Sequence, residues 1–154
     1  MPLPEGLGEI LTGTFGNCRS LTEFVVPDSV SRICDSAFFR CTSLTNIVLG
    51  KNVSSIADEA FYACTNLVGI SLPESVMTVG ASAFYRCSSI TNVVFGENVS
   101  SLGTYAFGEC AGLKTVSFGP CIRAIPQNAF KGCAGLLDAS FPNSVTNVDA
   151  YAFD

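Results

Sequence analysis

The sequence predicts a repeat solenoid of stacked coils with parallel β-strands, and three observations support this prediction. Six of the eight cysteines recur every 23 residues, at positions 18, 41, 64, 87, 110 and 133. Phenylalanines and aliphatic residues around them keep the same period. The apolar content of 48% is enough for a large core, and it comes in short segments rather than long ones. A period in the range of about 20–50 residues is typical of architectures whose units bury their apolar side chains only by stacking.

Apolar positions on both sides of each cysteine define the repeat unit. A phenylalanine stands three residues before the cysteine, and leucine or isoleucine stands three residues after it. Four further apolar positions follow, which in the second repeat are Ile47, Leu49, Val53 and Ile56. Since 154 residues at 23 per repeat correspond to about 6.7 repeats, we predict one solenoid over residues 1–154.

Each repeat divides into two extended segments and a turn. Residues 44–49 end in an apolar/polar alternation, which predicts a short strand. Gly50 follows, with Pro27, Pro73 or Pro142 at the equivalent place in other repeats, and these residues end the strand and turn the chain. Residues 53–56 form a second extended piece, and residues 60–64 suit a tight turn or a short helical turn. Parallel strands about 4.8 Å apart would give a core about 30 Å long.

The unit CTSLTNIVLGKNVSSIADEAFYA, residues 41–63, resembles the BspA-like (Treponema pallidum type) leucine-rich repeat. The resemblance extends from about residue 3 to residue 154. It implies a right-handed coil of parallel strands with little or no regular helix, because this subfamily places a second strand where others place a helix. Members of the family are mostly surface or secreted proteins of host-associated bacteria and some protozoa. The resemblance therefore implies adhesion or protein binding at the cell surface or outside the cell.

Composition and charge exclude several other functions. The chain has no histidine, which removes the commonest general base and most zinc sites. Only 8 lysines and arginines are present, without a basic run, so nucleic acid is not an expected partner. No apolar stretch approaches the roughly 18 residues of a membrane span. Residues 1–10 lack the positive start of a signal peptide.

No catalytic or cofactor-binding arrangement is recognisable in the sequence. The adjacent carboxylates of Asp58 and Glu59 fall in a turn without a repeated or facing partner. A phosphate-binding loop, a dinucleotide fingerprint and a calcium loop are all missing from the sequence. We therefore predict a protein that is not an enzyme and that needs no cofactor.

The cysteine series allows two interpretations. Stacked thiols could bind a soft metal or form disulfides, but side chains stacked in parallel rarely reach the dihedral angle of a disulfide. The simpler interpretation, which we favour, is that these cysteines are small buried apolar residues and not a metal site. Cys34 and Cys121 lie outside the series, and Cys121 occupies a polar turn position, so its thiol is predicted to be the more accessible.

Two surfaces are candidates for binding. The outward positions of the first strands, on the predicted concave face, are small and weakly charged, which does not favour a tight protein ligand. Phe39, Tyr62 and Tyr85 lie two residues before three successive cysteines, next to Arg40 and Arg86. Such a row could bind a protein or a glycan, or its rings could simply pack on one another and cover the neighbouring turn.

Both ends of the chain interrupt a repeat, and neither shows a polar capping unit. One explanation is that the chain belongs to a longer secreted protein. The other is that open ends of separate copies meet head to tail, which propagates into filaments. The sequence thus predicts a surface or secreted interaction module, with an extracellular filament protomer as the alternative.

Overall fold

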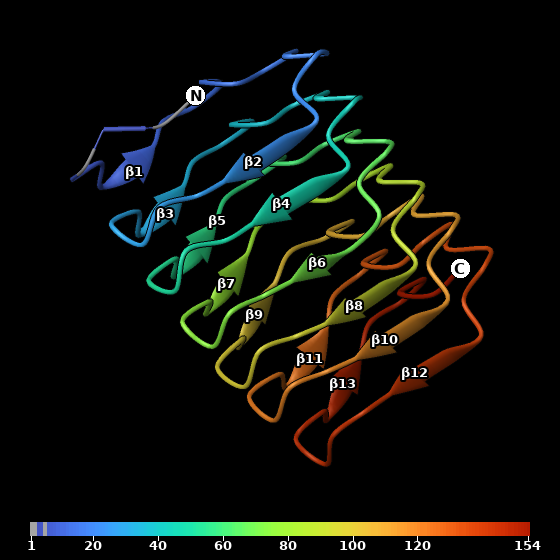
Figure 1. The fold of residues 1–154 in the computed structure, drawn as a ribbon. Helices are drawn as coiled ribbons and strands as arrows, with labels where there is room; N and C mark the ends of the chain where they lie inside the picture. The colour runs from blue at the N-terminus through green and yellow to red at the C-terminus, as the bar shows by residue number, and fades with distance from the viewer. Residues whose placement is uncertain (1–2, 5) are drawn as a thin grey trace.

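The computed structural model describes residues 3–4 and 6–154 of the chain. Met1, Pro2 and Glu5, which belong to the segment in which no signal peptide was predicted, lie outside the described residues. The described chain forms a stack of coils with two rows of parallel strands, running from the N-terminal coil to the C-terminal coil (Figure 1). No helix occurs in this part of the chain. The predicted parallel solenoid with a 23-residue repeat is therefore confirmed.

The two rows are formed by alternate strands. The odd-numbered row comprises β1 (Glu9–Ile10), β3 (Arg32–Ile33), β5 (Ser55–Ile56), β7 (Thr78–Val79), β9 (Ser101–Leu102), β11 (Ala124–Ile125) and β13 (Asn147–Val148). The even-numbered row comprises β2 (Glu23–Val25), β4 (Asn46–Val48), β6 (Ile70–Ser71), β8 (Asn92–Val94), β10 (Thr115–Ser117) and β12 (Asp138–Ser140). We call the solvent-facing sides of these rows the odd-strand face and the even-strand face.

Every strand pair has a register offset of 23 residues. Ile33 lies opposite Ile56, and Val93 lies opposite Val116, so equivalent residues of successive repeats form columns along the stack. Each row consists of two hydrogen-bonded sheets: strand pairing is interrupted between β9 and β11 in the odd-numbered row, and between β4 and β6 in the even-numbered row. Because one column holds one kind of residue, the sequence period directly determines which side chains meet.

The strands are shorter than the sequence predicts. Residues 44–49 were expected as a strand, but β4 covers only Asn46–Val48. The backbone N–H of Leu44 donates to the carbonyl of Cys41, and that of Val53 donates to the carbonyl of Gly50. These bonds close turns directly before and after the extended segment, and the ladder is confined to the three residues between them.

A column of phenylalanine rings runs through the core. The rings from Phe15 to Phe153 stack with centroids 4.9 to 5.6 Å apart, at interplanar angles of 3° to 16°. The five central rings have no solvent exposure. Stacked rings of this kind add about 0.5–1.5 kcal/mol per pair beyond the burial of apolar area. The column therefore holds successive coils at a uniform spacing.

The third side of each coil connects an odd-numbered strand to the next even-numbered one, and we call it the turn side (residues 57–69 in one coil). The residues one and five positions before each cysteine there have left-handed backbones, with φ between +53° and +61° at the non-glycine positions. Most of their N–H groups donate to the next coil, as Glu59 does to the Ala81 carbonyl at 2.9 Å and Ala63 to the Tyr85 carbonyl at 2.7 Å. These bonds form a third hydrogen-bonded ladder along the stack, and it orients the side chains of the turn side.

Candidate functional site

The predicted row of aromatic residues forms one continuous stack on the turn side. The ring centroids of Phe39 and Tyr62 are 5.0 Å apart, and those of Tyr62 and Tyr85 are 5.3 Å apart. All three side chains are half-buried. Because neighbouring rings cover one another's faces, the row presents mainly ring edges to solvent between its ends.

Both predicted arginines lie beside this stack. The guanidinium carbon of Arg40 is 5.1 Å from the centroid of Phe39, and that of Arg86 is 5.5 Å from the centroid of Tyr85. Neither guanidinium forms an ion pair within residues 3–4 and 6–154. A guanidinium held against a ring keeps its N–H donors available for a carboxylate or a carbonyl group. The structure thus brings all five predicted site residues together.

One member of the stack escaped the sequence analysis. Tyr105 lies five residues before its cysteine, in a different column, yet its ring meets Tyr85 edge to face with centroids 5.9 Å apart. It fills the place where Gly108 interrupts the aromatic column. Gly108 was the one sign of this contact in the sequence, because a glycine in the aromatic column leaves room for a ring from another column.

The opposite end of the stack borders a shallow, open hollow, which we call the cavity beside Phe39. A space of about 300 Å³ lies beside Phe39 and is lined by Gly13, Gly16, Asn17, Ser36, Phe39 and Glu59. Gly16 occupies the aromatic column one coil before Phe39, so the missing side chain leaves this end open. The 23-residue period shows that Gly16 is equivalent to Phe39, but it does not reveal the cavity.

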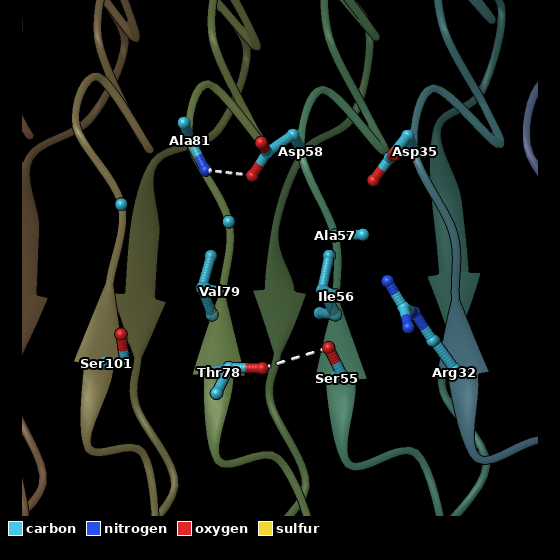
Figure 2. Close-up of a pocket in the computed structure, with 12 residues that line it drawn as sticks. Arg32, Asp35, Ser55, Ile56, Ala57, Asp58, Thr78, Val79, Ala81 and Ser101 are labelled. Atoms are coloured by element: carbon cyan, nitrogen blue, oxygen red, sulfur yellow. Dashed lines mark hydrogen bonds between the residues drawn. The ribbon is translucent and has the colours of Figure 1, made fainter.

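The odd-strand face carries a shallow groove of about 450 Å³ along β3 to β9 (Figure 2). Three of its polar side chains are hydrogen-bonded: the Ala81 N–H donates to the Asp58 carboxylate at 2.7 Å, and the Thr78 hydroxyl donates to the Ser55 hydroxyl at 2.9 Å. Asp58 lines this groove, while Glu59 lines the cavity beside Phe39. The two adjacent carboxylates therefore do not face a common reacting atom, in agreement with their assignment to a turn.

The even-strand face has a depression that the sequence analysis did not identify. About 430 Å³ of space lies over β6, where Gly69 and Ser71 replace larger side chains, and Asn46, Asn92 and Val94 form its edges. The remaining outward positions of this face are exposed and weakly charged, as predicted. The depression adds shape to this face but brings no charged anchor.

The cysteine series forms a ladder of thiols inside the stack. Each thiol from Cys41 to Cys133 donates to the carbonyl of the phenylalanine 26 residues earlier, over 3.0 to 3.2 Å. Burial raises the pKa of the Cys87 thiol to about 12 and that of Cys133 to about 11. Four of these thiols, those of Cys41, Cys64, Cys87 and Cys110, have no solvent exposure, which confirms that the central members of the series are buried.

The two cysteines outside the series differ in accessibility. Cys121 is exposed and Cys34 is half-buried, which confirms that Cys121 has the more accessible thiol. Groups of three or more residues able to hold a metal ion are not found among the residues that the structure describes. The part of the chain that the structure describes contains no helix long and apolar enough to cross a membrane.

Comparison with known families and structures gives a consistent result. Residues 35–154 match the family model described as a BspA type leucine rich repeat region, in six copies. No curated protein matches the chain. The leucine-rich repeat protein of Treponema pallidum is a similar solved structure, with 32% identity and a TM-score of 0.90, covering 96% of this chain and 71% of that one.

Two further solved structures extend the similarity. A leucine-rich repeat protein of Bacteroides ovatus is 25% identical with a TM-score of 0.75, and the match covers 92% of this chain and 43% of that one. A protein of Faecalibacterium prausnitzii described as a leucine rich cell surface protein is 21% identical with a TM-score of 0.56, covering 93% and 53% of the two chains. The last match shows only that the fold is shared.

Proposed function

Because the chain belongs to the family of BspA-type leucine-rich-repeat proteins, we propose that it is a non-enzymatic module that binds a protein or glycan partner outside the cell or on its surface. Proteins of this family are generally protein-interaction modules and typically surface or secreted proteins. The leucine-rich-repeat solenoid is typically a non-catalytic binding scaffold. Adhesion is the form of binding that we propose for this chain.

The observation that carries the proposal is the half-buried aromatic stack with its two arginines. Phe39, Tyr62 and Tyr85 are held at fixed spacing by the ladders of the turn side, so a partner need not order them on binding. Rigid aromatic side chains and arginines are the residues that dominate binding energy at interfaces. Arg40 and Arg86 add hydrogen-bond donors at the edge of the same surface.

The double variant Tyr62→Ala/Tyr85→Ala is expected to abolish partner capture while the chain stays folded. Each ring at the centre of an interface contributes about 2 kcal/mol or more when truncated, so two of them reduce affinity by at least about a thousandfold. The measurement is affinity capture from host surface and matrix extracts, followed by direct binding of the purified captured molecule. Tyr151→Ala, an exposed tyrosine outside the row, is the matched control. Equal capture by the double variant and the wild type would exclude this surface.

End-to-end assembly into an extracellular filament is the second candidate, and the apolar character of both terminal coils favours it. The first coils border a cavity of about 770 Å³ lined by Leu3, Phe15, Cys18, Leu21, Glu23, Phe24, Val25 and Pro27. Leu137, Phe141 and Val148 are exposed on the last coils. Unpaired strands at both ends offer backbone groups to another copy, and such contacts do not close.

Charges on the terminal coils test this second candidate. The double variant Leu7→Lys/Val148→Lys is expected to remain monomeric at concentrations where the wild type forms regular fibres, because a buried lysine in each contact is strongly unfavourable. Light scattering over a concentration series and negative-stain electron microscopy make the comparison, with Met77→Lys on the middle of the odd-strand face as control. A wild type that stays monomeric throughout the series rules out the filament.

A further inference from the structure

Glycines interrupt the aromatic column of the turn side at both ends. Two residues before successive cysteines the chain has Gly16, Phe39, Tyr62, Tyr85 and Gly108. Each glycine removes one ring, so the terminal aromatic residue has a ring neighbour from this column on one side only. The two glycines occupy equivalent positions of the repeat, but the space beside Gly108 is filled by a side chain and the space beside Gly16 is not.

The interruption at Gly108 is filled by the chain itself. A Cβ atom placed on Gly108 would lie 2.9 Å from Cδ2 of Tyr85 and 3.1 Å from Cδ1 of Tyr105. Tyr105 reaches this space from the column five residues before the cysteine, and its ring covers Tyr85 edge to face. The molecule thus shows which chemical group fits a gap of this shape, namely a phenol ring.

The interruption at Gly16 has no such filling. The residue equivalent to Tyr105 in this coil is Gly13, and nothing lies within 4 Å of a Cβ atom built there. The cavity of about 300 Å³ occupies this place. Within the described residues Phe39 stacks on no ring except that of Tyr62. The Arg40 guanidinium also lies against Phe39, with its carbon 5.1 Å from the ring centroid, but Arg40 is not one of the residues that line the cavity.

We propose that an aromatic side chain of a partner polypeptide, a tyrosine above all, occupies the cavity beside Phe39 in the way that Tyr105 lies against Tyr85. The ring would extend the stack by one member, and edge-to-face or offset contacts of this kind contribute about 0.5–1.5 kcal/mol beyond area burial. The polar edge of the cavity suits a phenol, because the Glu59 carboxylate can accept its O–H and the Asn17 amide can bind the partner's backbone. This inference rests on the proposed function and identifies the kind of partner: a protein and not a glycan.

Two blocked peptides provide a direct test, acetyl-Gly-Tyr-Gly-amide and its leucine counterpart. With isotope-labelled protein, the tyrosine peptide is expected to shift the amide signals of Gly13, Gly16 and Asn17 with a dissociation constant on the order of 1 mM, and the leucine peptide to bind about tenfold more weakly. Gly13→Tyr copies the arrangement at Tyr105 and fills the cavity from within, so binding is lost. Gly13→Ser matches Ser36 and Ser82 of the same column, adds no ring, and keeps binding.

Gly16→Phe is a second blocking variant, because it continues the existing stack and needs no left-handed backbone at the substituted residue. The proposal is overturned if either well-folded blocking variant still binds the tyrosine peptide, or if the leucine peptide binds equally well. Binding of methyl glucoside at this cavity in place of the tyrosine peptide also overturns it. If Tyr62→Ala/Tyr85→Ala loses partner capture while Gly13→Tyr retains it, the proposed function stands and this inference fails.

Discussion

Phe84→Ala is expected to lower the free energy of unfolding by about 3–5 kcal/mol, the usual cost of deleting a fully buried phenylalanine. Phe84 has no solvent exposure, and its ring stacks on Phe61 at 5.1 Å and on Phe107 at 4.9 Å. The substitution removes both stacks and leaves a cavity between coils that the three backbone ladders prevent from closing. Urea unfolding followed by circular dichroism gives the comparison with the wild type.

Phe153→Ala is the matched control for this prediction. Phe153 ends the same column, stacks on Phe130 at 5.2 Å and is only half-buried, so its loss is expected to cost clearly less. A cost below about 1 kcal/mol for Phe84→Ala would contradict the assignment of the phenylalanine column to the core.

Stability is expected to fall steeply above about pH 9, because three buried thiols stay protonated in the folded chain but ionise in the unfolded one. Burial raises the pKa of Cys87 to about 12 and that of Cys133 to about 11, and burial also raises the pKa of Cys110. An unfolded cysteine has a pKa of about 8.5. The stabilisation is thus complete below about pH 8.5 and is lost as the pH rises toward the folded pKa values.

The magnitude follows from proton linkage. Between the unfolded and folded pKa values, each thiol lowers the free energy of unfolding by up to about 1.4 kcal/mol per pH unit, so three together approach about 4 kcal/mol per unit. Urea midpoints measured under reducing conditions between about pH 7 and about pH 10 test this. Cys87→Ala/Cys110→Ala should show about a third of the slope, because only Cys133 of the three thiols remains. Identical midpoints at both ends of the range would mean that the thiols are accessible in the native state.

The core was predictable from the sequence because a 23-residue period places equivalent residues at stacked positions. Phe84, Cys87 and Ile90 are all fully buried, as their columns require. The proximity of Phe39, Tyr62 and Tyr85 was predictable for the same reason. Strand length was not, since turn hydrogen bonds at residues such as Leu44 depend on backbone geometry that the apolar pattern does not encode.

The ends of the aromatic stack could not be derived from the period. A column count compares each residue with its equivalents 23 positions away, whereas Tyr105 contacts Tyr85 by leaving its own column. That contact depends on the space left by Gly108 and on the rotamer of a side chain in a left-handed residue. The cavity beside Phe39 has the same origin, because it results from the joint absence of side chains at Gly13 and Gly16.

Each coil of the solenoid is hydrogen-bonded only to the coils next to it, and this determines how the solenoid responds to tension. Strand pairs, the turn-side ladder and the thiol bonds all join residues 22 to 26 positions apart, so under tension one boundary between coils can open while the others stay closed. A detached coil of 23 residues releases about 75–80 Å of chain and shortens the solenoid by only about 5 Å. Pulled from its ends, the protein would lengthen in steps while the remaining coils stay intact, and an attachment through it would absorb load before it breaks.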